Sequence, residues 1–243
     1  SVFRQPRVAV LATGDELVSD GAPLLPGQIR NSNGPGLSAQ CRAAGAKVVF
    51  EEVARDNEES VNAAISRGMK CDVLLISGGV SVGAYDYVRP ALLSAGVDIL
   101  FWRVLQRPGK PLAFGQHDKA LVFGLPGNPV SSAVCFEQYV RPVLRRMSGD
   151  TRPPGRLRAV LANDIEKKPE LHYFARGVAG QLQDGRLSVA LAGAQGSNIY
   201  SSMLQANCIV HLEGGREVVT AGSEVEIEPF SWAPWSAFCN NEA

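Results

Sequence analysis

The sequence lacks several features that would assign it at once to a broad class of protein. Its 24 basic and 24 acidic side chains leave no net charge, which argues against nucleic acid or an anionic membrane surface as the main partner. No apolar run reaches the roughly 18 residues that a membrane-spanning helix needs. The N-terminus has no hydrophobic stretch of the signal-peptide type, and we expect Ser1, which stands in place of an initiator methionine, to be a processing boundary.

Cysteine and histidine are scarce, and their spacing does not suit a metal site. The five cysteines form no Cys-x-x-Cys pair, and an odd number cannot all pair within one chain. Their apolar neighbours predict free, buried thiols, which fits a reducing cytoplasm better than a secreted disulfide scaffold. The three histidines are widely separated and form no zinc pattern. We therefore expect a cytoplasmic protein.

The remaining composition is that of an ordinary globular protein. Apolar residues make up 45% of the chain and charged residues 20%, which excludes a mainly disordered chain. A length of 243 residues predicts one large domain or two modest ones. The pattern changes at residues 151–155, where two prolines and a glycine are typical of a linker. We predict domains at residues 1–150 and 151–243, with a tail at 231–243 that is flexible or packs on a neighbouring surface.

The N-terminal part alternates between apolar strands and helical patterns. The predicted strands are 8–12, 47–53, 72–76, 99–105 and 120–123, and the predicted helices are 36–44, 57–67, 87–94 and 128–147. This alternation predicts an α/β domain, in which a mostly parallel sheet has helices on both faces. After the linker, short alternating runs at 157–162, 173–178, 187–191, 208–212 and 224–228 predict a small antiparallel β domain.

Ligands of open α/β sheets bind beyond the carboxyl ends of the strands, so the loops there are candidate sites. Thr13-Gly14-Asp15-Glu16 follows the first strand, and its plainest interpretation is a turn with a helix cap. Asp56 follows the second strand and could simply cap the next helix.

The loop after the third strand, Ser77-Gly78-Gly79-Val80-Ser81-Val82-Gly83, is the richest in glycine and serine. Its backbone N–H groups and hydroxyls suit an anion, although a glycine-rich turn without a ligand stays open. It is not a P-loop, because no Gly-Lys-Ser/Thr ends it. Asp86 lies just beyond the loop, and an acid there is costly unless it binds a metal or a polar heterocycle.

A run of cations follows the fourth predicted strand region. Arg103, Arg107 and Lys110 fall within eight positions, stiffened by Pro108 and Pro111. This cluster suits an oxyanion, and a basic surface loop is the alternative.

Residues 124–131 open the longest predicted helix, with Asn128 typical of an N-cap and Pro129 of the first helical position. A purely structural role therefore competes with ligand binding. Five polar or glycine-rich loops at successive strand ends nevertheless predict one site for a phosphorylated, polar ligand.

Taken in order, these motifs resemble those of the molybdopterin molybdotransferases, the family that includes bacterial MoeA and the E domain of gephyrin. The N-terminal motifs are Thr13-Gly14-Asp15-Glu16-Leu17, Ser77–Gly83 with Asp86, Pro108-Gly109-Lys110-Pro111 and Gly124-Leu125-Pro126-Gly127-Asn128-Pro129. Phe174-Ala175-Arg176-Gly177 and Gly193-Ala194-Gln195-Gly196-Ser197 are similar to motifs of the family's C-terminal β domain. The resemblance covers residues 7–230, almost the whole chain.

The resemblance implies an enzyme of molybdenum cofactor synthesis. Such enzymes take adenylylated molybdopterin and molybdate, hydrolyse the adenylate in a step that depends on Mg²⁺ or another divalent cation, and release AMP and the molybdenum cofactor. The implied catalytic residues are Asp56 and Asp86, with Asp86 also the implied metal ligand. The implied substrate-binding residues are Thr13, Gly14, Glu16, Ser77, Gly78, Gly79, Ser81 and Asn128. The implied molybdate-binding residues are Arg103, Arg107, Lys110, Pro111, Ser131, Arg176 and Ser197.

The sequence departs from the family pattern in two ways. Arg103 and Arg107 stand where the family often has lysine, which keeps the charge but changes the geometry. Family members also carry about as much chain again before this point, in two domains that support a homodimer and complete the active site from the partner subunit. We therefore expect a fragment or a split subunit with a separate or missing N-terminal portion.

Two other functions stay open. One is an enzyme that adenylylates molybdopterin, which uses a similar α/β domain, and the other is a non-catalytic scaffold or molybdopterin-binding module. The motifs with Arg176 and Ser197 favour the molybdotransferase.

Overall fold

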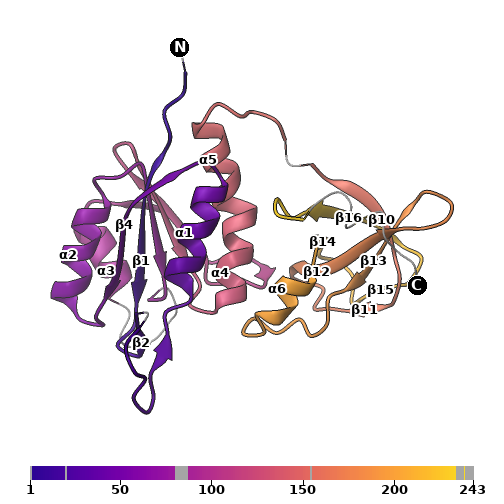
Figure 1. Cartoon of the computed structure of the whole chain (residues 1–243), viewed down its shortest axis with the longest axis horizontal. Helices are drawn as coiled ribbons and strands as arrows, with labels where there is room; N and C mark the ends of the chain where they lie inside the picture. Colours follow the sequence, from indigo (N-terminus) through magenta and orange to yellow (C-terminus); the bar gives the residue numbers. More distant parts are fainter. Residues whose placement is uncertain (1, 20, 80–86, 154, 234–237, 239–243) are drawn as a thin grey trace. The chain divides into compact units, whose positions relative to one another are not determined.

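The computed structural model describes residues 2–19, 21–79, 87–153, 155–233 and 238. The chain divides into two compact units (Figure 1). The N-terminal unit comprises Ser1–Val104 and Gly109–Thr151, and the C-terminal unit comprises Leu105–Pro108 and Arg152–Ala243. The short segment 105–108 thus belongs with the C-terminal unit, although it interrupts the N-terminal unit in sequence.

The N-terminal unit contains a six-stranded sheet with strand order β4-β1-β5-β9-β8-β6. The strands are β1 (Arg7–Thr13), β4 (Lys47–Ala54), β5 (Val73–Ser77), β6 (Asp98–Trp102), β8 (Ala113–His117) and β9 (Ala120–Leu125). Strands β1, β4, β5 and β9 are parallel, whereas β8 runs antiparallel to both of its neighbours. The carboxyl ends of the four parallel strands therefore lie at one edge of the sheet, where the sequence places the candidate loops. A short separate ladder joins β2 (Leu17–Val18) to β3 (Ile29–Arg30).

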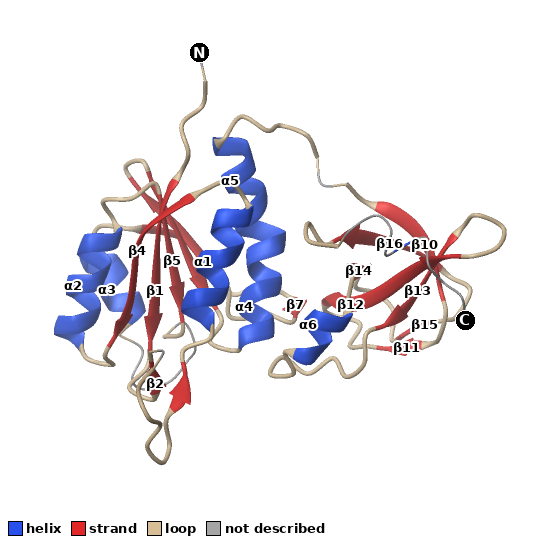
Figure 2. Ribbon diagram, viewed as in Figure 1, coloured by secondary structure: helices blue, strands red, loops and turns tan. Residues whose placement is uncertain are grey.

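Helices cover both faces of this sheet (Figure 2). They are α1 (Asn33–Ala43), α2 (Glu58–Gly68), α3 (Val88–Ser94), α4 (Pro129–Cys135) and α5 (Arg141–Met147). Val8 and Val10 of β1 share one apolar cluster with α1, α4 and α5, while Ala9 and Leu11 share the other with α2 and α3. Because successive side chains of a strand point to opposite faces, this division confirms the predicted α/β class.

The longest predicted helix is continuous but not uniform. A π-helical segment, η1 (Phe136–Val140), connects α4 to α5. Within it, the buried Glu137 carboxylate accepts hydrogen bonds from Arg141 Nε at 2.5 Å and from Gln40 Nε2 of α1 at 2.6 Å. The bond to Gln40 ties the C-terminal half of α1 to the middle of the long helix through a buried contact.

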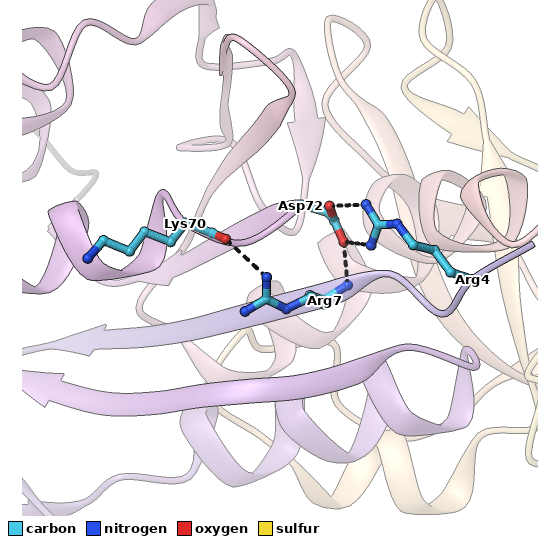
Figure 3. Close-up of polar contacts among 4 residues, drawn as sticks. All are labelled: Arg4, Arg7, Lys70 and Asp72. Carbon is cyan, nitrogen blue, oxygen red and sulfur yellow. Dashed lines mark hydrogen bonds and ion pairs between the residues drawn. The ribbon is translucent and has the colours of Figure 1, made fainter.

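The chain before β1 is fixed to the sheet through Asp72 (Figure 3). Arg4 Nη1 and Nη2 each donate to one Asp72 oxygen at 2.6 Å, and the Arg7 backbone N–H donates to Asp72 Oδ2 at 2.7 Å. These donors, the Arg4 side chain first, hold the pKa of Asp72 below its usual value. Arg4 is 69% exposed, so water screens this pair and limits what it adds to stability.

Among the described residues, the C-terminal unit has a six-stranded sheet in which five strands pair in a closed ring and the sixth, β7, pairs only with β12. The strands are β7 (Gln106–Arg107), β10 (Leu157–Leu161), β12 (His172–Gln181), β13 (Leu187–Leu191), β14 (Cys208–Leu212) and β16 (Glu224–Pro229). The order is β13-β10-β16-β14-β12-β7, and β13 also pairs with β12, which closes the ring. Only the β10–β13 and β7–β12 pairings of this sheet are parallel, so the predicted, largely antiparallel domain is confirmed. A second small ladder joins β11 (Ile165–Glu166) to β15 (Val218–Val219), and α6 spans Ser201–Gln205.

The predicted free thiols are confirmed for the four described cysteines, Cys41, Cys71, Cys135 and Cys208, all of which are buried. Cys239 lies outside the described residues. Phe238 of the tail is buried in the core of the C-terminal unit. Among the described residues, no helix combines the length and the apolar character that a membrane span requires.

Candidate functional site at the carboxyl edge of the sheet

Loops from four parallel strands meet at the carboxyl edge of the N-terminal sheet. The Gly14 N–H donates to the Ala54 carbonyl at 3.4 Å, which joins the loops after β1 and β4. The Gly78 N–H donates to the Leu125 carbonyl at 3.2 Å, which joins the ends of β5 and β9. The structure therefore brings the predicted residues of these loops to one place.

Two acids from the loops after β1 and β4 bond to each other's backbone. The Asp56 N–H donates to Asp15 Oδ1 at 3.1 Å, and the Asp15 N–H donates to Asp56 Oδ2 at 3.4 Å. Burial raises the pKa of Asp56; the Asp15 N–H opposes this rise, and the charges of Asp15 and Glu16 add to it. Asp56 therefore holds a proton more readily than an ordinary aspartate.

Asp56 is not the cap of the following helix. Asn57 is the N-cap residue of α2, and its side-chain oxygen accepts a hydrogen bond from the Ser60 N–H at 2.9 Å. The interpretation of Asp56 as a helix cap is thus wrong, because the next residue fills that role. The Asp56 carboxylate instead accepts a hydrogen bond from the Asp15 backbone N–H at the edge of the loop.

The glycine loop after β5 packs directly against Thr13. Gly78 and Gly79 have φ angles of 91° and 62°, in the region that favours glycine. A Cβ at Gly78 would lie 2.8 Å from the Thr13 carbonyl oxygen, and one at Gly79 would lie 2.9 Å from Thr13 Oγ1. Both positions therefore require glycine for the loop to approach β1 this closely.

The Thr13 hydroxyl is buried without a partner. Thr13 is 6% exposed, and its Oγ1 makes no hydrogen bond within the described part of the chain. A buried hydroxyl in this state costs about 1–3 kcal/mol. A polar ligand seated on the glycine loop would recover that free energy, which is a reason to count Thr13 as a binding residue.

Asn33 joins two of these loops, although the sequence analysis did not single it out. Its Nδ2 donates to Ser77 Oγ and to the Gly127 carbonyl, both at 2.7 Å. The available signal was the polar run Asn31-Ser32-Asn33-Gly34 directly before a predicted helix. Asn33 is the first residue of α1, so the helix start supplies the bridging amide.

The start of α4 matches the sequence expectation in its backbone. Asn128 occupies the N-cap position and Pro129 follows in the first turn, but the Asn128 side chain makes no capping hydrogen bond. Ser131 is buried in the same turn. The helix therefore begins correctly without using the Asn128 amide as a cap, which is compatible with another role for that amide.

The predicted cation loop is divided between the two units. Arg103, Lys110 and Pro111 belong to the N-terminal unit, and Arg107 belongs to the C-terminal unit. The Arg103 N–H donates to the Leu112 carbonyl at 2.7 Å, which closes the loop at its base. The side chains of Arg103 and Lys110 are exposed, and neither forms an ion pair in the described ranges.

Within the C-terminal unit, Arg107 lies against Tyr173. Its Nη1 donates to the Tyr173 hydroxyl at 3.3 Å, and its guanidinium carbon lies 5.4 Å from the ring centroid. Lys167 Nζ lies 5.3 Å from the same centroid. Burial raises the pKa of Tyr173, but the Lys168 N–H, Arg107 and the charge of Lys167 outweigh it and lower the pKa.

Arg176 lies in the interior of the C-terminal unit and holds a loop. It is 1% exposed; its Nε donates to Ser202 Oγ at 3.1 Å, and its Nη2 donates to the carbonyls of Ala194 and Gly196 at 3.3 and 3.1 Å. Burial lowers the pKa of Arg176 to about 10, and the charge of Arg107 adds to the effect. The guanidinium is therefore charged at neutral pH and supports the backbone directly before Ser197.

Arg107 and Arg176 both line a small cavity of about 120 Å³ in the C-terminal unit. Its other lining residues are Pro108, Ile165, Glu166, Tyr173, Phe174, Ala175, Leu191 and Gln195. The volume is well below the roughly 300–1,000 Å³ of pockets for drug-sized ligands. Two arginines at such a cavity suit a small oxyanion better than a nucleotide.

The described residues contain no cluster of three metal-binding side chains. No group of three or more His, Cys, Asp or Glu side chains within the described ranges could hold a metal ion. Asp86, the expected metal ligand, and Ser81, an expected substrate-binding residue, both lie outside the described residues.

Comparison with known proteins points to one family. Residues 9–146 match the family model described as "Probable molybdopterin binding domain", and residues 158–230 match "MoeA C-terminal region (domain IV)". A molybdopterin molybdenumtransferase of Haemophilus influenzae is 37% identical over 232 residues, which is 94% of this chain and 57% of the relative. The Bacillus subtilis protein of the same name is 34% identical over 242 residues, covering 97% of this chain and 56% of the relative.

A solved structure agrees with these relatives. The molybdopterin biosynthesis MoeA protein of Pyrococcus horikoshii superposes with a TM-score of 0.78 at 30% identity, covering 93% of this chain and 55% of that one. The chain thus spans about half the length of the curated relatives it matches.

Proposed function

Because the chain belongs to the molybdopterin-binding domain family and carries a MoeA-type C-terminal domain, we propose that it is the ligand-binding and C-terminal portion of a molybdopterin molybdotransferase. In this proposal it binds adenylylated molybdopterin at the carboxyl edge of the N-terminal sheet. Molybdate is the second substrate, and AMP and the molybdenum cofactor are the products. The chain's similarity to named molybdenumtransferases supports the reaction class.

The observation that carries the proposal is the glycine loop against Thr13. The backbone N–H of Gly79 suits a phosphate, whereas that of Gly78 already bonds to the Leu125 carbonyl. The Thr13 hydroxyl, which has no partner among the described residues, suits a polar ligand seated on the loop. Ser77, Gly14, Glu16 and Asn128 lie on the same set of loops, and we assign them to substrate binding with Thr13.

We assign Asp56 to adenylate cleavage. A carboxylate with a raised pKa can accept the proton of the attacking water as the phosphoanhydride bond breaks, and later return it. Asp86 is proposed as its partner and as the ligand of Mg²⁺ or another divalent cation.

We assign molybdate binding to two groups of residues. In the N-terminal unit these are Arg103, Lys110, Pro111 and Ser131, and in the C-terminal unit they are Arg107, Arg176 and Ser197. Molybdate is a tetrahedral dianion, so charge-assisted hydrogen bonds from arginine and lysine suit it. Arg176 contributes partly by holding the loop that carries Ser197.

The test is AMP release by the purified chain supplied with adenylylated molybdopterin, Mg²⁺ and molybdate. Release that depends on molybdate supports the proposal. Adenylylation of molybdopterin from ATP would support an adenylyltransferase instead, and binding without turnover would support a binding module. Because the chain spans about half of its relatives, the same assay is repeated with the upstream half of a relative added, and sedimentation then tests the expected homodimer.

A further inference from the structure

Asn33 connects two loops of the candidate site with a single amide group. Its Nδ2 donates one hydrogen bond to Ser77 Oγ and one to the Gly127 carbonyl, each at 2.7 Å. A carbonyl oxygen can only accept, so the contact with Gly127 fixes which end of the amide faces the loops. Both amide protons are thereby used, and Oδ1 has no partner among the described residues.

The start of α1 holds Asn33 in place independently of those loops. Asn31 is buried, and its Oδ1 accepts a hydrogen bond from the Gly34 N–H at 3.0 Å. One turn later, Ser38 Oγ donates to Glu51 Oε2 of β4 at 2.5 Å. The first turn of α1 is thus bonded to Asn31 and the second turn to the sheet, and these contacts hold the backbone of Asn33 in place.

Between the described residues of the two loops, one other side-chain hydrogen bond is found beyond the strand ends. Ser77 Oγ donates to the Pro126 carbonyl at 3.4 Å, which is at the long limit for a hydrogen bond. A Cβ at Gly127 would lie 3.7 Å from the Gly78 Cα, which shows how near the two backbones run. The short bonds from Asn33 are therefore the stronger polar link between the Ser77–Gly79 loop and the Gly127 turn.

We propose that Asn33 is a positioning residue that fixes the glycine loop for the phosphate of the pterin ligand. It acts by donating both amide protons across the loops after β5 and β9, not by touching the reacting atoms. This inference rests on the function proposed above for its ligand, but the geometry that it describes exists without the ligand. Loss of the two bonds loosens the Ser77–Gly79 loop before any ligand arrives, and binding must then order it.

Two substitutions separate donation from other roles. Asn33→Ala removes the amide, and Asn33→Asp keeps its size but replaces both donor protons with an acceptor. An aspartate in the first turn of a helix is favourable to the helix dipole, so Asn33→Asp does not weaken α1 itself. Asn163→Asp, an exposed change of the same kind in the C-terminal unit, is the matched control.

The experiment measures amide hydrogen exchange at Gly78 and Gly79 in the free chain, and then titrates the chain with adenylylated molybdopterin. We expect faster exchange and weaker binding, each on the order of tenfold, in both Asn33 variants but not in Asn163→Asp. Ser77→Ala removes one of the two acceptors and leaves α1 untouched, so it should give a smaller increase in exchange at Gly78 and Gly79; its binding is not compared, because Ser77 is itself assigned to the ligand.

Two results would overturn the inference. Wild-type exchange at Gly78 and Gly79 in both Asn33 variants would show that the bonds do not hold the loop. Wild-type affinity in Asn33→Asp with weak binding in Asn33→Ala would show that the residue acts as an acceptor. If the wild-type chain itself does not bind adenylylated molybdopterin, the proposed function is wrong, while the exchange arm still decides the positioning role.

Discussion

Thr13→Val offers a test in which stability and binding should move in opposite directions. The Thr13 side chain is buried, and its Oγ1 has no hydrogen-bond partner in the described ranges. Valine replaces the hydroxyl with a methyl group of similar size and keeps the β-branched shape that suits β1. The change therefore removes a buried unsatisfied group without opening a large cavity.

The magnitude follows from that one atom. Relief of an unsatisfied buried hydroxyl is worth about 1–3 kcal/mol at most, so we expect Thr13→Val to be more stable by about 1 kcal/mol. For a unit of this size, that raises the melting temperature by about 2–4 °C. If the hydroxyl bonds to an ionised ligand, its loss costs about 1.5–3 kcal/mol of binding, or on the order of tenfold to a hundredfold in Kd.

The assays are calorimetric unfolding of the free chain and titration with adenylylated molybdopterin. Ser132→Ala is the matched control, because Ser132 is 1% exposed and its Oγ is also without a partner among the described residues. The control should be equally or more stable and should bind as the wild type does. A Thr13→Val chain that is less stable and binds normally would show that the hydroxyl is satisfied within the fold and has no part in binding.

The strands and helices of the N-terminal unit could be predicted because their signals are local. Continuous apolar runs gave β1, β5 and β9, and the i, i+3, i+4 spacing of Val61, Ala64 and Ile65 gave α2. Strand β8 was missed because it ends at His117, directly before the tight turn at Asp118, which has a positive φ of 50°, and β9 begins at Ala120, so that the two strands look like one loop and one strand. The antiparallel strand is thus a tertiary feature that periodicity does not reveal.

The candidate site was predicted loop by loop, but its connections were not. Asn33 and Gly127 are 94 positions apart, and nothing in either segment alone indicates that they meet. The same holds for residues 105–108, which look like part of a single cation loop but belong to the C-terminal unit, where Gln106 and Arg107 pair with β12. Sequence motifs identify residues that could bind a ligand, whereas long-range hydrogen bonds decide which of them are held together.

Four other changes test the charged groups and the anion-binding residues of the two units. Asp56→Asn should stabilise the chain at pH 7, because the folded pKa of Asp56 is raised and its ionised form is therefore disfavoured in the fold. In urea titrations, the extra stability of the variant should shrink as the pH falls through that raised pKa. A stability difference that stays the same at low pH would contradict the raised pKa of Asp56. Asp72→Asn should lower the free energy of unfolding at pH 7 by at most about 1 kcal/mol, because Arg4 is exposed. Since the folded pKa of Asp72 is lowered, the stability difference between the two chains should vanish as the pH falls through that folded pKa. Equal stability of both chains at pH 7 would show that the contact in Figure 3 contributes nothing. Arg176→Lys should destabilise the C-terminal unit by about 2–4 kcal/mol, because one ammonium cannot reach Ser202 Oγ and two carbonyls as the planar guanidinium does, and a buried charge then lacks partners. The same variant should bind molybdate on the order of tenfold more weakly, because the loop before Ser197 is no longer held. Ser197→Ala should also lower the molybdate affinity, but with little loss of stability. Calorimetric unfolding measures the loss of stability, and a molybdate titration measures the loss of affinity. If Arg176→Lys destabilises the C-terminal unit but binds molybdate as the wild type does, the loop does not need Arg176 to bind the anion.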